Sequence, residues 1–405
     1  MIEQEKNPKQ STSGKPGERE KTQMQKTFLF VSAQYLPTLG GVERYTNNLA
    51  RRLRAMGHRV IVLTSALHGL PAQEVDAHGI EIIRIPSIGL MNGRFPVLRP
   101  GAQFREMAKQ LWSRSIDYCV INTYFYPLSM YAAGKTKKRK IPSLMINHGS
   151  AWLMTGSKPV QLAGRIYERC AAWVCHRSCK RFFGVSEMAR QWMQNFGIIA
   201  EGIITNAIDP VDVHRSVNRD LDWRAHLGLT PEAKLIAFVG RMIPEKGVDQ
   251  MITAMESIRR LHPNAYLVMA GAGPLLDQWK EKSPEGVFLT GGQAYSDVLA
   301  LLQQADLFCL PSRSEGFACT VLEAAAMGCP VITTATGGSP QLLCDRRYGI
   351  LLESMSPEAI STACLEALGD VAWRASASAL AEQRLRENFT WDAAVQQLIQ
   401  AFQLK

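Results

Sequence analysis

The sequence lacks the features that define several classes of protein. No stretch approaches the ~18 consecutive apolar residues of a membrane-spanning helix. Residues 1–26 hold no apolar segment of the ~7–15 residues that a signal peptide requires. The nine cysteines are odd in number and scattered through a chain far longer than disulfide-dense scaffolds. We therefore expect a reduced, cytoplasmic protein in which residues 1–26 form a disordered polar tail.

What is present indicates a globular protein with an anionic partner. Apolar residues make up 46% and charged residues 20% of the 405, which excludes intrinsic disorder as the main state. The length suits two or three domains. Lysine and arginine number 46 against 36 acidic residues, a net charge of +10. This excess suits a nucleotide, a nucleic acid or an acidic membrane surface.

Short apolar runs alternate with amphipathic segments in two successive sets. Predicted strands lie at 27–33, 59–64, 81–85, 118–122, 143–147, 181–185 and 203–206, and then at 234–240, 265–270, 286–290, 307–311, 330–333 and 349–352. A polar stretch, 209–230, separates the two sets. Buried apolar strands separated by helices are typical of parallel sheets, so we expect an α/β protein with two doubly wound, Rossmann-like domains. A single closed β/α barrel is the competing fold, which the polar junction disfavours.

Two segments carry features of phosphate sites. Gly40 and Gly41 follow the first strand, where the absence of a Cβ lets the backbone approach a phosphate. The alternative is a purely structural turn, and the absence of GxGxxG disfavours a nicotinamide cofactor. In GRMIPEKG, Arg241 and Lys246 are placed to converge on one diphosphate. The alternative is that both are simply solvated surface cations.

The segment 311–338 carries the strongest signal. Glu315 ends a loop after a strand, and Gly316–Thr320 is predicted to open a helix whose free N–H groups face an anion. Glu323, between Val-Leu and Ala-Ala-Ala, is predicted to be a buried carboxylate. Together, the two glutamates suit an elongated polyhydroxylated ligand. The alternative is one capping and one surface glutamate.

Three lesser features leave alternatives open. Gly271–Pro274 (GAGP) reads equally as a structural turn or a close approach to a ligand. His148, in INHGS, ends a strand and is either a satisfied polar residue or a site residue. The spacing of Cys170, Cys175, His176 and Cys179 lacks the zinc-knuckle pattern, so we expect core packing there and no metal.

The motifs LGGVER, INHG, GRMIPEKG, GAGP and EGFACTVLEAAAMGCPVITTATGG, taken together, resemble the retaining, nucleotide-sugar-dependent glycosyltransferases of family 4. The resemblance spans residues 27–405 and implies the GT-B fold, in which two domains face a central cleft. It implies an acceptor-binding domain over 27–208, a nucleotide-sugar-binding domain over 209–385, and a terminal helix within 386–405 that crosses back.

The resemblance also implies roles for single residues. Glu323 would bind the donor ribose, and Glu315 the donor sugar near the reacting carbon, with His148 binding that sugar from the first domain. Arg241 and Lys246 would neutralise the diphosphate. The backbone positions expected to line the nucleotide are Gly40, Gly41, Gly271, Gly273, Gly316, Phe317, Ala318, Cys319 and Thr320. The pattern departs from the family at Gln341, where a glutamate is usual, at Ala318, and at Thr205–Ala207.

The resemblance implies an enzyme without cofactor or metal that moves a hexose from a nucleoside-diphosphate sugar, with UDP expected in preference to GDP, by front-face attack. The expected acceptor is lipid-linked or a growing envelope polysaccharide. A soluble acceptor, a non-catalytic binding protein and a sugar phosphorylase are the alternatives. Lys135–Lys140 (KTKKRK) and the cations interleaved with apolar residues over 94–114 suit peripheral contact with the anionic inner face of the cell membrane. We expect no nucleic acid, because KTKKRK has no interleaved aromatics.

Overall fold

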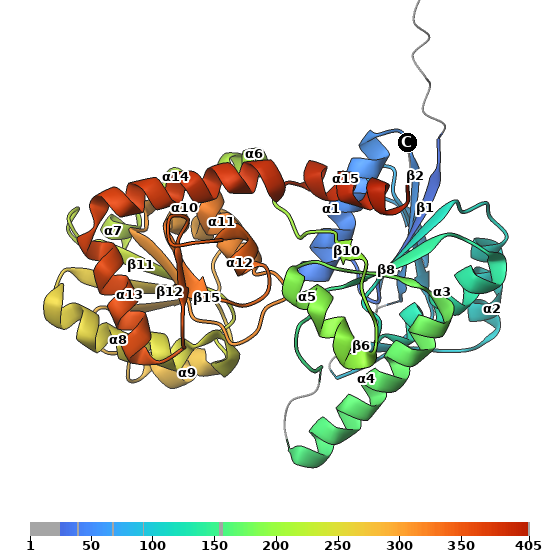
Figure 1. The fold of residues 1–405 in the computed structure, drawn as a ribbon, viewed down its shortest axis with the longest axis horizontal. Coiled ribbons are helices and arrows are strands. Elements are labelled where there is room, and N and C mark those ends of the chain that lie inside the picture. Colours follow the sequence, from blue (N-terminus) through green and yellow to red (C-terminus); the bar gives the residue numbers. More distant parts are fainter. Residues whose placement is uncertain (1–24, 39, 67–68, 92, 154–156, 404–405) are drawn as a thin grey trace, which may run out of the picture.

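The computed structural model describes residues 25–403, apart from 39, 67–68, 92 and 154–156. It shows two parallel sheets side by side, each between layers of helices (Figure 1). The predicted tail therefore lies almost wholly outside the described residues. The two sheets and their flanking helices are the α/β architecture expected from the sequence.

The first sheet has eight strands in the order β10-β9-β8-β7-β1-β2-β4-β3. All its pairs are parallel except β3 with β4. The strands are β1 Thr27–Val31, β2 Arg59–Ser65, β3 Gln73–Val75, β4 Glu81–Ile85, β7 Tyr118–Asn122, β8 Ser143–Asn147, β9 Arg181–Gly184 and β10 Gly202–Ile203. A separate antiparallel pair consists of β5 Ser87–Leu90 and β6 Phe95–Leu98. The helices in this half of the chain are α1 Gly41–Ala55, α2 Ala102–Trp112, α3 Pro127–Arg139, α4 Lys158–Ser178 and α5 Glu187–Trp192, with a 3-10 turn η1 Met193–Phe196.

Alternate side chains of each strand in this sheet enter different cores. Phe28 and Phe30 of β1 pack in the cluster beneath α1, and Leu29 and Val31 pack in the cluster beneath α2, α3 and α4. Side chains of a strand alternate between faces, so a run of five apolar residues implies helices on both sides. This is why TFLFV forms a central strand.

The second sheet has six parallel strands in the order β13-β12-β11-β14-β15-β16. They are β11 Lys234–Val239, β12 Ala265–Ala270, β13 Val287–Gly291, β14 Leu307–Leu310, β15 Val331–Thr334 and β16 Ile350–Leu352. The helices are α6 Pro210–Arg215, α7 Trp223–His226, α8 Val248–Leu261, α9 Pro274–Lys280, α10 Tyr295–Gln304, α11 Cys319–Ala326, α12 Ser339–Leu342, α13 Pro357–Gly369 and α14 Val371–Asn388, with a 3-10 turn η2 Pro244–Lys246.

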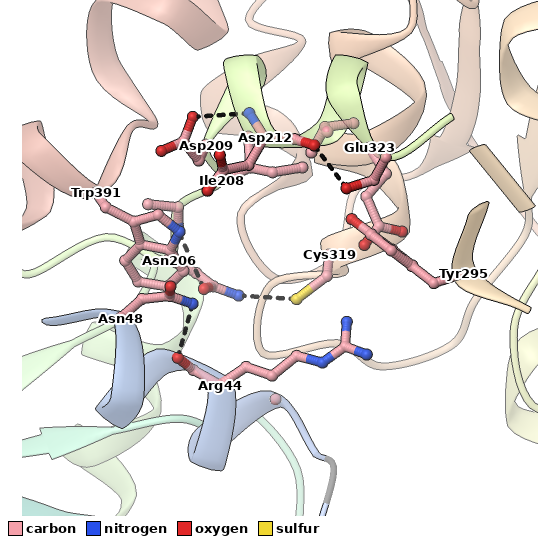
Figure 2. Close-up of a pocket in the computed structure, with 14 residues that line it drawn as sticks. Arg44, Asn48, Asn206, Ile208, Asp209, Asp212, Tyr295, Cys319, Glu323 and Trp391 are labelled. Carbon is pink, nitrogen blue, oxygen red and sulfur yellow. Dashed lines mark hydrogen bonds between the residues drawn. The ribbon is translucent and has the colours of Figure 1, made fainter. Parts of the chain in front are cut away.

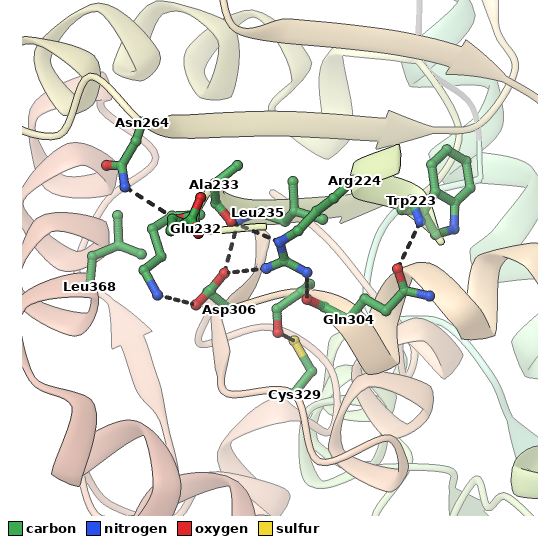
Figure 3. Close-up of polar contacts among 12 residues, drawn as sticks. Trp223, Arg224, Glu232, Ala233, Leu235, Asn264, Gln304, Asp306, Cys329 and Leu368 are labelled. Carbon is green, nitrogen blue, oxygen red and sulfur yellow. Dashed lines mark hydrogen bonds and ion pairs between the residues drawn. The ribbon is translucent and has the colours of Figure 1, made fainter. Parts of the chain in front are cut away.

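An ion-pair network fixes the polar segment between the two sheets to the second one (Figure 3). Asp306 accepts from Arg224 at 2.9 Å and from Lys234 at 3.1 Å. It also accepts from the Leu235 backbone N–H at 3.0 Å. These groups lie where β11 and β14 begin, at the opposite edge of the sheet from the strands' carboxyl ends. The network is therefore structural.

The last helix, α15 Trp391–Ala401, packs against α1 of the first sheet. The Trp391 and Tyr45 rings lie edge to face with their centroids 5.8 Å apart. Arg52 of α1 pairs with Asp209 at 2.6 Å and with Asp392 at 2.9 Å. One side chain thus holds both chain segments that cross between the sheets. The domain limits at 209 and 386 stay predictions, and residue 386 falls within α14.

Three predictions about elements were wrong or incomplete. The sequence reading missed β3, β5 and β6, which are only three or four residues long. The strand expected over 203–206 ends at Ile203, and beyond it the Thr205 backbone N–H donates to the Gln397 side chain of α15. The helix expected to open at Gly316 begins at Cys319. Within the described residues, no helix is long and apolar enough to cross a membrane.

Candidate active site

Lys246 and Glu315 form an ion pair on loops that follow two neighbouring strands, β11 and β14. Only 16% of the Lys246 side chain and 10% of that of Glu315 are exposed. The carboxyl ends of parallel strands share one edge of a sheet, which is where α/β proteins bind ligands. The structure thus brings together two of the residues that the sequence singled out, one of each charge.

Arg241 lies on the same loop as Lys246 and is exposed. The GAGP turn supports that loop, because a Cβ on Gly271 would lie 1.7 Å from the Gly240 carbonyl oxygen, and one on Gly273 would lie 2.5 Å from that of Met242. Both glycines are therefore required by close backbone packing. A direct contact of Gly271 or Gly273 with a nucleotide, and the convergence of Arg241 with Lys246 on one diphosphate, stay predictions.

The segment Glu315–Ala318 contacts the first half of the chain. The Ser150 hydroxyl donates to the Glu315 carbonyl at 2.6 Å, and the Ser186 hydroxyl donates to the Gly316 carbonyl at 2.9 Å. A Cβ on Gly316 would lie 1.9 Å from the His148 carbonyl oxygen. The proposed phosphate loop is therefore held directly against the ends of strands in the first sheet.

The backbone amides predicted to face an anion surround the start of α11. Phe317 and Ala318 are buried, and Cys319 and Thr320 form the first turn of α11. Asn206, in the crossing segment, donates to the Phe317 carbonyl at 3.3 Å and to Cys319 Sγ at 3.3 Å. The helix starts three residues later than expected, so its first-turn N–H groups come from Cys319 onward and not from Gly316.

His148 is held in one neutral tautomer by a chain of hydrogen bonds. The Thr46 hydroxyl donates to the Val42 carbonyl at 2.7 Å and so accepts from Asn122 Nδ2 at 2.9 Å. The Asn122 carbonyl oxygen then faces His148 Nε2 at 2.8 Å, which makes Nε2 the donor. Burial lowers the pKa of His148 to about 3. His148 Nδ1 is consequently a hydrogen-bond acceptor at neutral pH.

Glu323 is buried, as the sequence predicted, and its side chain is 5% exposed. Burial raises the pKa of this carboxyl group, and the opposing influences are Arg44 and a hydrogen bond from Tyr295. The Arg44 guanidinium lies over the Tyr295 ring, 5.5 Å from its centroid. A buried carboxylate with a cation and a hydroxyl group beside it is suited to bind the hydroxyl groups of a ligand.

A pocket of about 150 Å³ joins these groups across the seam between the two sheets. Figure 2 shows the Arg44 side chain reaching from α1 toward Cys319 and Tyr295, with Glu323 beyond. Gly41 also lines this pocket. The structure therefore gathers three predicted site residues, Gly41, Cys319 and Glu323, around one cavity.

Gly40 has a neighbour that the sequence reading did not anticipate. A Cβ on Gly40 would lie 2.2 Å from the Glu43 carboxylate, which sits in the first turn of α1. Burial raises the pKa of Glu43. A side chain at position 40 would therefore displace the Glu43 carboxylate, and contact of Gly40 with a phosphate stays a prediction.

Several residues of the site were missed or read differently from the sequence. Arg44 and Tyr295 were not singled out, although Arg44 follows the Gly-Gly pair by three residues on the same helix. Asn122 carried no motif of its own. Gln341 accepts from the Glu187 backbone N–H at 2.8 Å, so its amide joins the two halves.

The cysteine and histidine group expected to pack in the core is divided between surface and interior. Cys175 and Cys179 are buried, and Cys170 is exposed. Among the residues that the structure describes, no group of three or more histidine, cysteine, aspartate or glutamate side chains is placed to hold a metal ion. The sequence-based expectation of a metal-free enzyme stays a prediction.

Two family models match the chain, one for each sheet. Residues 39–211 match the model described as Glycosyltransferase Family 4, and residues 220–384 match Glycosyl transferases group 1. Among solved structures, sucrose-phosphate synthase from Thermosynechococcus elongatus has a TM-score of 0.73 at 18% identity, over 93% of this chain and 98% of that one. Anabaena HepE, in complex with UDP and glucose, has a TM-score of 0.71 at 17% identity, over 93% and 99%. The fold is thus that of the GT-B glycosyltransferases.

Curated relatives match over nearly the whole chain. Glycogen synthase of Mycobacterium tuberculosis is 26% identical over 93% of this chain and 94% of its own length. A GDP-mannose-dependent phosphatidylinositol monomannoside mannosyltransferase of the same organism is 25% identical over 91% and 96%. The chain belongs to glycosyltransferase family 4, and the protein is a glycosyltransferase.

Proposed function

We propose that the enzyme transfers a hexose from a UDP-sugar to an acceptor hydroxyl with retention of configuration. The observation that carries this proposal is the arrangement along one seam of Glu323, the Lys246–Glu315 pair and the neutral His148. Glu323 would bind the ribose of the donor. The Lys246–Glu315 pair would bind the diphosphate and the sugar attached to it, and His148 would bind a hydroxyl group of that sugar. The pocket at Glu323 is smaller than the ~300–1,000 Å³ of a typical ligand site, so the donor would extend beyond it toward Lys246.

The chemistry follows from the charges that change during transfer. Breaking the bond to the anomeric carbon places negative charge on the leaving diphosphate, and Lys246 and Arg241 supply positive charge to hold it. We therefore propose transfer that needs no metal. Attack on the same face from which the diphosphate leaves would retain configuration, with a phosphate oxygen taking the acceptor proton. Glu315 would bind the sugar rather than serve as nucleophile.

We propose a lipid-linked or polysaccharide acceptor and peripheral contact with the inner face of the cell membrane. The mannosyltransferase relative is named for a phosphatidylinositol acceptor, and a fold neighbour, WaaG, for lipopolysaccharide biosynthesis. In this chain, α3 ends in Lys137, Lys138 and Arg139, all exposed. A soluble acceptor, such as the name of sucrose-phosphate synthase indicates for that protein, is the second candidate.

One experiment tests the proposal directly. The purified protein is incubated with UDP- and GDP-hexoses, with and without a membrane lipid extract and with and without a chelator. Release of nucleoside diphosphate and the anomeric configuration of the product are measured. Turnover of a UDP-hexose with retention, unaffected by the chelator, is expected. Binding of donors without any turnover would favour the non-catalytic alternative, and preference for GDP-hexoses would overturn the assigned nucleotide.

A further inference from the structure

The longest helix of the first half, α4, has one face that contacts the protein and another that does not. Figure 1 shows α4 extending away from the first sheet, with one end beyond the neighbouring elements. The buried residues of α4 lie on its inner side and are Gly164, Glu168, Ala171, Ala172 and Cys175. The opposite side faces outward along the whole helix.

Three large apolar side chains line that outward side. Leu162 is 61% exposed, Ile166 is 56% exposed and Trp173 is 61% exposed. At 3.6 residues per turn, positions separated by four and by eleven residues lie on the same side of a helix. Leu162, Ile166 and Trp173 therefore form one stripe, and contiguous exposed apolar surface of this kind marks interaction sites.

Cations flank this stripe on both sides. Lys158, Arg165 and Arg169 lie along one edge and Arg177 along the other, and all are exposed. The Arg177 guanidinium lies 5.1 Å from the Trp173 ring centroid. The apolar stripe and these four cations are called here the α4 outer face.

No carboxylate offsets these charges on α4 itself. Its single acidic residue, Glu168, is turned inward, where it accepts from the Tyr124 hydroxyl at 2.9 Å and the Leu153 backbone N–H at 2.6 Å. A helix with an apolar centre, basic edges and no exposed acid is the pattern of interfacial membrane helices. Tryptophan and arginine are the residues that bury an apolar body while keeping polar atoms in the headgroup region.

We propose that the α4 outer face docks on an anionic lipid leaflet. A second copy of the chain fits less well, because a twofold contact would place arginines of one copy against those of the other. A nucleic acid would gain little from the apolar centre. On a membrane, the stripe enters the headgroup–acyl boundary and the flanking cations meet lipid phosphates, each contributing about a fivefold gain in binding.

The position of α4 connects docking to the proposed reaction. The chain reaches α4 from His148 and Ser150, and Ser150 contacts the Glu315 carbonyl. A membrane under α4 would therefore lie against the first half of the chain, where the acceptor is proposed to bind. In this respect the inference rests on the proposed function, although docking itself requires no donor or acceptor.

Vesicle flotation tests the inference without turnover. Vesicles of phosphatidylcholine alone and mixed with phosphatidylglycerol are compared at low and high salt. The protein is expected to float with the anionic vesicles at low salt. Ile166→Ser with Trp173→Ser, and separately Arg165→Gln with Arg169→Gln, should each weaken binding at least tenfold. Leu261→Ser with Val371→Ser is the matched control, since these side chains are 68% and 67% exposed elsewhere and their loss should change nothing.

A label at Cys170 shows which part of the protein meets the membrane. Cys170 is exposed on α4, and Cys344 is an exposed cysteine of the second half. An environment-sensitive fluorophore on Cys170, in a Cys344→Ser background, should shift to the blue on anionic vesicles. The same fluorophore on Cys344, in a Cys170→Ser background, should not.

Other outcomes would overturn the inference. The first is equal vesicle binding by the α4 variants and the control. The second is loss of binding only when Lys135–Lys140 is neutralised. The third is a dimer in sedimentation that dissociates in the variant with Trp173→Ser and Ile166→Ser. Donor turnover without vesicle binding would remove docking alone. Vesicle binding without turnover of any nucleotide sugar would remove the proposed function alone.

Discussion

His148 Nε2 lies 2.8 Å from Asn122 Oδ1, and this contact makes Nδ1 the imidazole nitrogen that can accept a hydrogen bond. Asn122 is in turn oriented by Thr46, through a hydrogen bond of 2.9 Å. A donor-sugar hydroxyl can therefore donate to His148 Nδ1 but cannot accept from it. Asn122 and Thr46 are positioning residues in this arrangement, and His148 is the group that would touch the sugar.

Asn122→Asp should introduce a loss of activity through protonation of His148 that the native enzyme lacks. A carboxylate beside Nε2 favours the charged imidazolium, so the pKa of His148 would rise from about 3 toward the ~6.5 of a free histidine or above it. Below that pKa, Nδ1 carries a proton and no longer accepts, so activity should fall as pH decreases through it. In the native enzyme, protonation of His148 should cost no activity above pH 5, so any pH dependence there should come from Glu323.

The pH–rate profile and the NMR titration of His148 together check this prediction. Thr46→Val removes the acceptor that orients Asn122 and should lower kcat/KM about tenfold, because the Asn122 amide is then free to turn. Thr46→Ser keeps the hydroxyl and should restore the rate. A flat profile for Asn122→Asp, with an unshifted His148 titration, would contradict the assigned tautomer.

Lys246→Ala should reduce both turnover and stability. Loss of one cation that faces a leaving group costs about 10²–10³ in rate. It also leaves the largely buried Glu315 carboxylate without its partner, which lowers the free energy of unfolding. Replacing both residues, Lys246→Ala with Glu315→Gln, should recover stability and leave activity low. Kinetics and denaturant unfolding measured on the same samples separate the two effects, and near-native turnover in Lys246→Ala would exclude Lys246 from the site.

Glu323→Gln should stabilise the protein while weakening donor binding. Burial raises the pKa of Glu323, so the folded state holds this proton at pH values where the unfolded chain has released it. The free energy of unfolding therefore decreases as pH rises above the ordinary glutamate value, and the substitution removes this slope. A carboxylate accepts from ribose hydroxyls more strongly than an amide does, so native affinity for UDP should increase with pH.

Calorimetric titration with UDP across pH checks the prediction for Glu323. The Glu323→Gln variant should bind UDP more weakly, with no change of affinity over the same pH range. Glu353→Gln, at an exposed position of the second half, is the matched control and should behave as the native protein. Native affinity that is flat in pH would exclude Glu323 as the residue that binds the ribose.

The sequence predicts the sheets well because their strands are buried on both faces. Runs such as TFLFV and KLIAFV are apolar at successive positions, and the structure places them centrally in each sheet. The short strands β3, β5 and β6 escaped prediction because three or four residues are too few to display a periodic apolar pattern. Their pairing depends on tertiary contacts that one sequence does not display.

The site was predictable to the extent that single residues mark it. Glu323 stands out because a charged residue interrupts an apolar helix, and it proves to be buried. Arg44, Tyr295 and Asn122 act through contacts between segments far apart in the chain, which no local spacing reveals. The structural reason for a glycine at position 316 was equally impossible to predict, because a side chain there would clash with a carbonyl group in the other half.

Asp306→Asn should destabilise the protein without affecting donor binding. Asp306 is the shared partner of Arg224 and Lys234, and its side chain is 13% exposed. Removing its charge leaves two cations facing a neutral amide, at a cost of about 2–3 kcal/mol in the free energy of unfolding. Asp345→Asn breaks a surface pair with Arg347, in which the two side chains are 42% and 75% exposed, and should leave stability unchanged. Denaturant unfolding measures both, and equal stability of the two variants would exclude the network as a clamp.

Gly316→Ala should abolish transfer by keeping the two halves of the molecule apart. The added Cβ would lie 1.9 Å from the His148 carbonyl oxygen, and this backbone atom belongs to the other half, so we expect the halves to move apart to relieve the contact. Activity should fall at least about 100-fold, since displacement of reacting groups by 1 Å costs that much. Gly149→Ala is the matched control, because nothing lies within 4 Å of its Cβ position, and it should retain activity. Small-angle scattering should show Gly316→Ala more extended than Gly149→Ala. Equal activity and equal dimensions would mean that the halves do not close here during catalysis.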